Sequence, residues 1–463
     1  MRKILYIISV LILCLIFSSC HGQKYIDPFV MPEEFDDSRQ YNISFWAKND
    51  SNPTQRAIYE KAITEFEKIY TNINVEIRHY ASYPDLYRSI LQNVGTNTTP
   101  NVAIAYPDHV ATYLENPRLV VKLEDVIEHS KYGLGGSEVK FNSPKKEDMI
   151  KEYLEEGYIY IDGNVGLYTL PFMRSTECLY VNKTWLEEHN FSIPNNNIFS
   201  WDYIWEICEK AIELDPNMIP LIYKSSDNFF IQLAHQNGYD FTTEDGKILF
   251  YNDNNVNMVK KLNKLYKKGL FVTWQNTGFY PGDKFNIGKT IFGVDSSAGA
   301  TWMGPKSPLG QVSEMDFEVL VTTIPQVDVN NPKVISQGPS LCVFNKEDNQ
   351  EVLASWLFLQ FLLTNEVQID YIKTEGYAPV TYTAINSREF NQFINSDEIY
   401  SVQRDAILNV LEYKSKAFVT PAFTGSALVR DNVGTIIDKA TISKKKEIDI
   451  ESLFKKALLD SGA

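Results

Sequence analysis

Residues 41–77 read YNISFWAKNDSNPTQRAIYEKAITEFEKIYTNINVEI and contain two kinds of hydrophobic pattern. Apolar and polar side chains alternate over residues 41–46 and again over residues 73–77, which is typical of strands that are buried on one face. Between them, residues 54–70 place apolar side chains at helical spacing, at Ile58, Ala62, Phe66 and Ile69. A strand, a helix and a second strand at this spacing predict a parallel βαβ unit.

Similar units follow along the chain. Strands are expected at residues 102–105, 167–170, 178–181, 221–223, 290–294 and 341–344. Helices are expected at residues 85–94, 201–214, 229–236, 256–268, 352–363 and 450–459. This order predicts an α/β fold with additional helices in the C-terminal third. Because no Pro- or Gly-rich linker divides the body, two lobes would require a chain that crosses between them more than once.

The N-terminus has the layout of a secretory signal peptide, which we expect to span residues 1–19. Arg2 and Lys3 precede an apolar run over residues 4–17, which is too short to cross a bilayer. No later stretch offers the roughly 18 uninterrupted apolar residues that a spanning helix needs. The chain is therefore expected to be exported.

Small residues stand directly before a cysteine at the end of this signal. Ser18, Ser19 and Cys20 resemble a bacterial lipobox, in which the cysteine is acylated after cleavage. We therefore expect a lipoprotein that is lipid-anchored through Cys20, with residues 20–40 as a polar, flexible tether. The alternative is an ordinary signal peptide followed by a coincidental cysteine.

Composition narrows the classes of function. A chain of 463 residues with 44% hydrophobic content can bury a large core and suggests two or more domains. The net charge is −15, and it becomes −17 once Arg2 and Lys3 leave with the signal. An acidic chain without a dense basic stripe repels phosphate backbones, so nucleic acid is not expected as a partner.

Motifs of enzymes and metal sites are missing from the sequence. None of the six histidines has a ligand partner at metal-binding spacing, and there is no HExxH or G-x-S-x-G motif. Gly288 and Lys289 resemble the end of a phosphate loop, but Asp283 stands where the loop needs glycine. We therefore expect no metal, no cofactor and no catalysis. Paired carboxylates for glycoside cleavage stay open, because their separation depends on the fold.

Three cysteines remain in the body of the chain, namely Cys178, Cys208 and Cys342. They lie in apolar runs, which is typical of inert buried thiols. Three widely spaced cysteines do not form a disulfide framework, although one bridge between two of them stays open.

Aromatic and polar residues occur together after the expected strands, where open α/β sheets bind ligands. The chain has 27 Tyr, 26 Phe and 7 Trp. Candidates at strand ends are Trp46 with Lys48, Asn49 and Asp50; Tyr106 with Asp108; Asp227 with Asn228; and Trp302. A sugar has an apolar C–H face and a rim of hydroxyls, which suits an aromatic ring beside carboxylate and amide groups.

Eight short motifs follow one another in an order that resembles a known family. They are Ile43–Trp46, Gly95–Val102, Gly166–Phe172, Leu179–Lys183, Ser200–Asp202, Gln236–Gly238, Phe285–Lys289 and Gly376–Pro379. Their full-length order resembles the extracellular solute-binding proteins of ABC importers that serve maltose, oligosaccharides and glycerol phosphate.

The resemblance implies a two-lobed, periplasmic-binding-protein-like (type II) fold with discontinuous lobes and three hinge crossovers. The crossovers would fall near residues 173–176, 334–338 and 379–383. The N-terminal lobe would combine residues 41–173 with 337–380, and the C-terminal lobe residues 177–334 with 384–463. Such a receptor closes over its ligand by hinge motion, and the transporter recognises the closed form.

The resemblance also implies a ligand site between the lobes. The matching positions are Asn49, Asp50, Tyr83, Asp108, Ser175, Glu177, Asp227, Asn228, Trp302, Gly338, Ser340 and Tyr377. Asp108, Glu177 and Asn228 would recognise hydroxyls, and Trp46, Trp302 or Tyr377 would stack on the ligand ring. Ala105 stands where maltose binders carry a tryptophan, which argues against maltose itself. A neutral ligand is preferred because Lys48 and Arg174 are the only basic residues nearby.

The sequence thus predicts the substrate-binding lipoprotein of an ABC importer, which captures a sugar, polyol or related solute. It would be a monomer without cofactor, with ABC permease subunits as partners, and would face the periplasm or the cell exterior. Two alternatives are a surface polysaccharide-degrading enzyme and a ligand-free interaction protein on the same fold.

Overall fold

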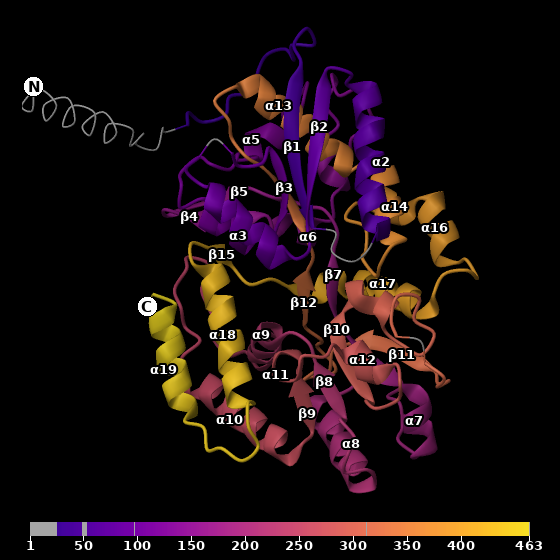
Figure 1. The fold of residues 1–463 in the computed structure, drawn as a ribbon. Helices are drawn as coiled ribbons and strands as arrows, with labels where there is room; N and C mark the ends of the chain where they lie inside the picture. The colour runs from indigo at the N-terminus through magenta and orange to yellow at the C-terminus, as the bar shows by residue number, and fades with distance from the viewer. Residues whose placement is uncertain (1–25, 49–52, 97, 312, 463) are drawn as a thin grey trace, which may run out of the picture.

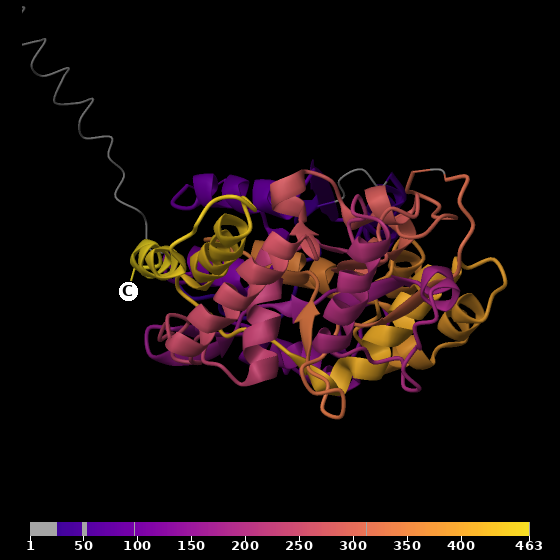
Figure 2. The same ribbon diagram turned by 90° about the horizontal axis from the view of Figure 1, so that it is seen from below.

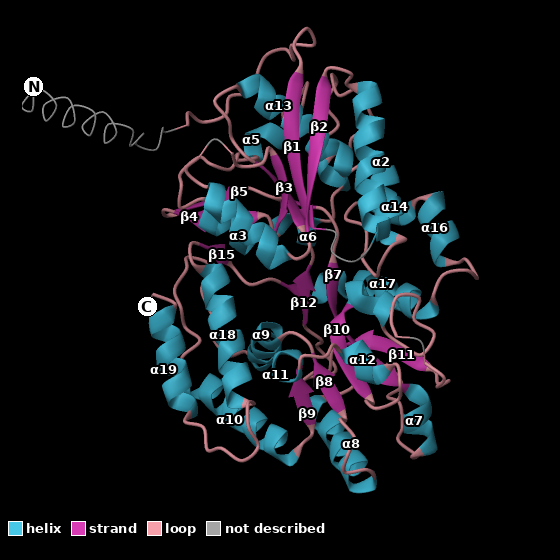
Figure 3. Cartoon of the chain, viewed as in Figure 1, coloured by secondary structure: helices cyan, strands magenta, loops and turns pink. Residues whose placement is uncertain are grey.

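The computed structural model describes residues 26–48, 53–96, 98–311 and 313–462. Over these residues the chain forms two lobes, each built on its own β-sheet (Figure 1). Helices surround both sheets (Figure 3). The α/β class and the two-lobed fold expected from the sequence are confirmed.

The first lobe begins with the expected βαβ unit. β1 (Tyr41–Lys48) pairs in parallel with β2 (Ile73–Tyr80), and α2 (Pro53–Ile69) connects them. The sheet order is β2-β1-β3-β13-β6, in which β3 is Val102–Ala105, β13 is Ser340–Val343 and β6 is Leu170–Pro171. Because β13 arrives from far along the chain, this lobe is discontinuous.

Helices cover both faces of this sheet. They are α3 (Tyr83–Asn93), α4 (Pro107–Tyr113), α5 (Glu124–Ile127), α6 (Lys151–Glu155), α13 (Asn349–Leu362) and α14 (Asn365–Ile372). Residues 352–362 of α13 are all buried, as expected of a helix at the centre of the lobe. Among the described residues, no single helix has the length and apolar character to cross a membrane. The helices α13 and α14 together have that length and character, but the pair is bent by 54°.

The second lobe is organised around β7 (Ser175–Asn182), whose eight residues are all buried. The sheet order is β14-β12-β7-β10-β8-β9, and β11 also pairs with β7. These strands are β8 (Leu221–Tyr223), β9 (Phe271–Thr273), β10 (Phe292–Ser296), β11 (Val319–Thr323), β12 (Val334–Gln337) and β14 (Ala417–Phe418). A strand buried on both faces needs continuous apolar character, which β7 has over Cys178–Val181.

The helices of the second lobe lie around this sheet. They are α7 (Lys183–Glu188), α8 (Trp201–Leu214), α9 (Ser226–Asn237), α10 (Asp253–Lys268), α11 (Trp274–Thr277), α12 (Pro281–Phe285), α17 (Ser401–Tyr413), α18 (Ser426–Ala440) and α19 (Ile450–Asp460). The C-terminal helices α18 and α19 lie side by side at one end of the lobe (Figure 1 and Figure 2). Two short helices, α15 (Tyr382–Asn386) and α16 (Arg388–Ile394), place Ala384, Phe390 and Ile394 in the core of the first lobe.

A third, small sheet has the order β15-β4-β5 and joins distant parts of the chain. β4 (Tyr158–Ile161) and β5 (Asn164–Leu167) form a hairpin, and β15 (Ala422–Phe423) pairs with β4 just before α18. The strand expected over residues 167–170 is therefore wrong. The chain leaves the small sheet at Leu167 and enters the first sheet at Leu170, so it changes sheets within that stretch.

The described part of the expected tether, residues 26–40, packs against the first lobe. Phe35 stacks on Tyr41 with ring centroids 5.2 Å apart, and its backbone N–H donates to the Tyr132 hydroxyl. Phe29 and Met31 pack on the same core. Apolar side chains in this segment thus attach it to the lobe, while the expected signal peptide and Cys20 lie outside the described residues.

Three connections between the lobes meet at Arg174. The backbone of Arg174 exchanges two hydrogen bonds with Ala378, at 3.1 and 2.8 Å. Gly338 lies beside them with φ 123°, and a Cβ there would be 2.3 Å from the Met173 carbonyl oxygen. Only glycine avoids both the left-handed strain and this clash.

The side chain of Arg174 is fully buried at this junction. Its guanidinium donates to the carbonyls of Met173, Gly338 and Pro339 and to Ser340 Oγ. Its Nε is 3.0 Å from Glu156 Oε2, which forms a buried ion pair. Burial raises the pKa of Glu156, and Arg174 opposes that rise.

Replacing Arg174 by methionine should strongly destabilise the protein. The change leaves the Glu156 carboxylate buried without its cation, which costs about 3–5 kcal/mol in comparable buried pairs. Urea unfolding measures the free energy directly. The double variant R174M/E156Q should unfold at a higher urea concentration than R174M alone, and a loss below about 1 kcal/mol for R174M would contradict this account.

Candidate functional site

Polar side chains from both lobes meet at the ends of the strands. In the first lobe, Tyr106 and Asp108 follow β3, where Pro107 begins α4, and Tyr83 begins α3 after its N-cap Ser82. These positions are fixed because the carboxyl ends of parallel strands share one edge of a sheet.

The second lobe contributes a matching set from four elements. Glu177 lies in β7, Tyr223 ends β8, Asp227 and Asn228 lie in the first turn of α9, and Arg430 lies in α18. β7 is the strand that continues from the Arg174 junction. Glu177 is therefore three residues from the point where the lobes are joined.

Glu177 is buried at the centre of this group, with 1% of its surface exposed. The Tyr223 hydroxyl donates to its carboxylate, and Asn228 Nδ2 donates to Oε1 at 3.2 Å. Burial raises the pKa of Glu177 to about 8, against the opposing effect of these two hydrogen bonds, and the charges of Asp227 and Asp295 raise it further. At neutral pH Glu177 is thus mainly a neutral acid that can donate a hydrogen bond.

Arg430 links the two lobes electrostatically. Its guanidinium donates to Asp227 Oδ2 at 2.7 Å and to Asn228 Oδ1 at 2.6 Å, and its Nε lies 3.7 Å from Asp108 Oδ2 of the first lobe. Burial lowers the pKa of Arg430, but Asp227 and Asp108 more than compensate, and the net shift is upward. Arg430 therefore stays charged between two carboxylates.

A second ion pair lies at the end of β10. Lys224 Nζ is 2.6 Å from Asp295 Oδ1 and 5.4 Å from the centroid of the Tyr280 ring. Burial lowers the pKa of Lys224, but Asp295 raises it more. Both basic residues of the site are thus neutralised by acidic neighbours.

Tyrosines form the first-lobe side of the site. The rings of Tyr83 and Tyr106 meet edge to face with centroids 4.9 Å apart, and the hydroxyls of both interact electrostatically with that of Tyr377. Burial raises the pKa of all three hydroxyls, so they stay protonated and can donate or accept hydrogen bonds.

Most of the residues expected in the site fall into three groups: a polar network, a tyrosine group and the lobe junction. One connected network contains Asp108, Glu177, Asp227 and Asn228, and the tyrosine group contains Tyr83 and Tyr377. Ser175, Gly338 and Ser340 lie at the lobe junction, where Ser340 Oγ accepts from Arg174. Asn49 and Asp50 lie outside the described residues.

Two tryptophans lie apart from the network. Trp46 is buried within β1, where its ring contacts Tyr80 at 5.5 Å and the Arg78 guanidinium at 4.8 Å. Its ring is therefore covered by neighbours on the strand β2. Trp302 is exposed at the end of a short 3-10 helix, and no ring contact among the described residues joins it to the network.

Sequence reasoning missed Arg430, Lys224, Tyr223 and Asp295. Tyr223 and Lys224 end and follow a predicted strand, so the rule that ligands bind at strand ends could have found them. Arg430 has no such signal because it lies within a C-terminal helix, and only folding brings it to Asp108.

The described residues contain no group of three or more His, Cys, Asp or Glu side chains that could hold a metal ion. Cys178, Cys208 and Cys342 are free and buried, and burial raises the pKa of each thiol. Thiols of this kind are poor nucleophiles.

A family model described as bacterial extracellular solute-binding protein matches residues 61–398, which is most of the chain. No curated protein matches this chain.

Solved structures show the same fold. The GacH receptor of Streptomyces glaucescens aligns with a TM-score of 0.67 and 15% identity over 91% of this chain and 99% of its own. An ABC substrate-binding protein from Listeria monocytogenes in complex with cycloalternan aligns with a TM-score of 0.71 and 15% identity over 91% and 98%. UgpB from Mycobacterium tuberculosis in complex with glycerophosphocholine aligns with a TM-score of 0.68 and 14% identity over 91% and 97%.

Because the pKa of Glu177 is raised in the folded protein, we expect the free energy of unfolding to fall as the pH rises. The folded protein holds a proton on Glu177 up to a pH of about 8, whereas in the unfolded chain Glu177 releases it near its ordinary pKa of 4.5. Between these values the folded state binds more protons, so the free energy of unfolding decreases by up to about 1.4 kcal/mol per pH unit from this group.

The variant E177Q isolates this contribution, because glutamine imitates the protonated acid and keeps both neighbours. Urea unfolding from pH 5 to pH 9 should show wild type and E177Q close together at the acid end, and E177Q the more stable at the alkaline end. A constant difference between them across this range would contradict the assignment.

Proposed function

The chain belongs to the family of bacterial extracellular solute-binding proteins, and on this premise we propose that it is the receptor of an ABC importer for a carbohydrate-like solute. The observation that carries the proposal is the polar network that spans the lobes, in which Arg430 of the second lobe faces Asp108 of the first. A solute bound here would contact both lobes at once.

The chemistry of the network suits a neutral ligand with many hydroxyls. Asp108, Asp227 and Asp295 offer acceptor oxygens, while the protonated Glu177 and the tyrosine hydroxyls can donate. The site contains these three carboxylates but only two cations, Arg430 and Lys224. The excess of acidic groups disfavours an anionic solute. Tyr83, Tyr106 and Tyr377 add aromatic surface for the C–H face of a sugar.

The ligands of structural neighbours support this class. The GacH receptor was solved with acarbose, the Listeria monocytogenes protein with cycloalternan, and a solute-binding protein from Thermotoga lettingae with α-D-tagatose. All three ligands are carbohydrates or carbohydrate analogues. The glycerophosphocholine of UgpB shows that the same fold also accepts a charged polyol derivative.

Closure of the lobes about the Arg174 junction would produce the ligand-bound form that the transporter recognises. Residues 41–173 and 337–380 would move against residues 177–334 and the C-terminal segment, with α15 and α16 moving with the first lobe on whose core they pack. A ligand that contacts Asp108 of the first lobe and Asp227 of the second together binds the closed form more tightly, and therefore shifts the population towards closure.

The export, membrane anchoring and oligomeric state of the receptor are inferred from the sequence. Export by the signal peptide, acylation of Cys20 and display on the outer side of a bacterial membrane would hold it near the permease subunits. The receptor would act as a monomer, since one chain contributes both walls of the network.

Thermal unfolding tests the ligand class. The chain from Ile26 onward is titrated with sugars, polyols, their phosphates and amino acids, and a ligand of the folded state raises the melting temperature with concentration. A saturable rise with a neutral sugar or polyol is expected. A response confined to amino acids or to phosphates would contradict the proposal.

The variant D108N should weaken binding of the solute identified in this way by about ten- to a hundredfold. Asparagine keeps the shape but loses the charged acceptor, and hydrogen bonds to charged groups contribute about 1.5–3 kcal/mol. Isothermal titration calorimetry measures the change. D460N is the matched control, because Asp460 lies on α19 in a surface pair with Lys456. Equal affinity of D108N and D460N would exclude Asp108 from the site.

A further inference from the structure

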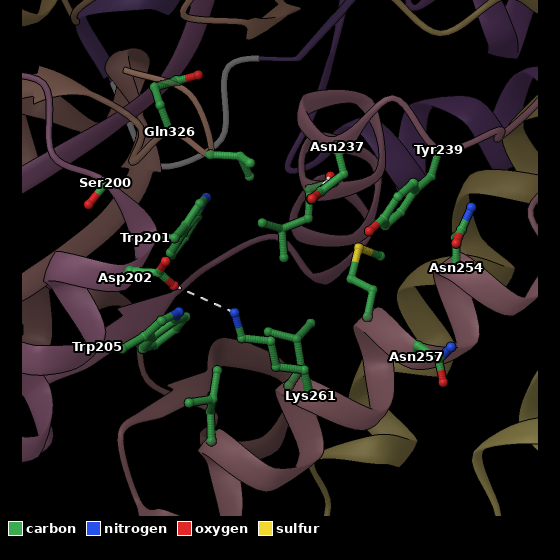
Figure 4. A pocket seen from close by; sticks show the side chains of 15 residues that line it. Ser200, Trp201, Asp202, Trp205, Asn237, Tyr239, Asn254, Asn257, Lys261 and Gln326 are labelled. Atoms are coloured by element: carbon green, nitrogen blue, oxygen red, sulfur yellow. Dashed lines mark hydrogen bonds and ion pairs between the residues drawn. The ribbon is translucent and has the colours of Figure 1, made fainter. Parts of the chain in front are cut away.

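A cavity of about 520 Å³ lies in the second lobe, on the side of α9 that is remote from the interlobe network. α8, α9, α10 and the segment after β11 form its walls (Figure 4). Asn228 at the start of α9 belongs to the network, while Asn237 at its end lines the cavity. At 1.5 Å per residue these positions are about 14 Å apart along the helix. The cavity is therefore separate from the interlobe network.

The floor of the cavity is apolar and firmly held. Trp201 and Trp205, one turn apart on α8, stack with ring centroids 5.4 Å apart and an interplanar angle of 19°. Trp201 Nε1 donates to Gln236 Oε1 at 3.1 Å, and Gln236 Nε2 donates to the Pro325 carbonyl at 3.0 Å. These bonds join α8, α9 and the segment after β11, so the floor is preorganised.

Three polar groups at the cavity have no partner in the part of the chain that the structure describes. They are the indole N–H of Trp205, the hydroxyl of Tyr239 and Oδ1 of Asn237, whose Nδ2 donates to the Leu233 carbonyl. Figure 4 shows the Tyr239 hydroxyl and the Trp205 indole directed towards the space between α8 and α10. A donor, a hydroxyl and an acceptor are thus available together.

The rim is charge-balanced. Lys261 of α10 and Asp202 of α8 face each other at 3.6 Å, and both side chains are exposed (Figure 4). Asn254 and Asn257 add amide groups on the α10 side. A rim with one cation and one anion favours a ligand without net charge.

We propose that this cavity is a second saccharide-binding site, on the outer side of the second lobe. A neutral mono- or disaccharide places its C–H face on the apolar side chains of Met258 and Leu262 of α10 and its hydroxyls on Trp205, Tyr239 and Asn237. The volume is within the usual range of about 300–1,000 Å³ for small-molecule sites. The cavity is open and few polar groups converge on it, so the affinity is expected to be weak, with a dissociation constant of about 1 mM.

A second site of this kind does not depend on the interlobe site. It would keep a neutral mono- or disaccharide near the receptor at the cell surface, while the interlobe network captures the solute for transport. Its failure and that of the interlobe proposal are distinguishable, because different residues carry them.

Nuclear magnetic resonance of the indole N–H groups tests the proposal. The chain has seven tryptophans, and the signal of Trp205 is assigned by its loss in W205F. Glucose, maltose and cellobiose are titrated into the chain from Ile26. At least one of them should shift the Trp205 signal saturably, and the shift should persist in D108N, in which the interlobe network is weakened.

The variant Y239F removes one hydroxyl and keeps the ring, and should weaken this titration about five- to tenfold, as expected for one hydrogen bond of about 1 kcal/mol. Y251F is the matched control, since Tyr251 is a partly buried tyrosine of the same lobe that packs on Phe454 outside the cavity. A Trp205 signal that none of the three sugars shifts, a shift that is lost in D108N, or equal titrations of Y239F and Y251F would each overturn the proposal.

Discussion

The buried guanidinium of Arg174 is the constraint on which the arrangement of the lobes depends. It binds carbonyls on two of the connections between the lobes, its own backbone pairs with the third at Ala378, and its charge is balanced by Glu156. A fully buried cation is tolerated only where such partners surround it. The three connections therefore cannot shift relative to one another at this junction without losing several of these bonds at once.

The position of the site follows from this junction. β7 runs from Arg174 directly into the second sheet and brings Glu177 to the boundary between the lobes. Burial there keeps Glu177 protonated near neutral pH, so its carboxyl group can act as a hydrogen-bond donor beside the side chains of Asp108, Asp227 and Asp295. The network thereby offers both donors and acceptors to a hydroxyl-rich solute, while Arg430 and Lys224 remain neutralised by their own partners.

α9 connects two different environments of the second lobe. Its first turn supplies Asp227 and Asn228 to the interlobe network, and its last residue, Asn237, lines the outer cavity. The helix between them is almost entirely buried, and Gln232 and Gln236 hold it to the segment around Lys333 through hydrogen bonds. Its two ends are therefore held in fixed positions relative to each other.

Local periodicity in the sequence was sufficient to predict the α/β class. The alternation over residues 41–46 and the helical spacing from Ile58 to Ile69 depend on neighbours in the chain, and the structure confirms the unit they predict. The rule that sheets bind ligands at strand ends likewise predicts Asp108 and Asn228 as candidates, and both lie in the network between the lobes. By contrast, residues 167–170 look like one strand, yet the chain changes sheets there, which no local pattern encodes.

Tertiary structure alone decided the electrostatics of the site. Arg430 meets Asp108 only because α18 packs beside α4, and Trp46 is covered only because β2 lies next to β1. The protonation of Glu177 depends on its burial, which outweighs the opposing hydrogen bonds from Tyr223 of β8 and Asn228 of α9, because a pKa responds to the desolvation and the charges that surround the group in space. The sequence by itself therefore determined the class of fold and several residues at the strand ends. Their charge states, their partners and their meeting across the lobes depend on contacts between distant segments, which exist only in the folded chain.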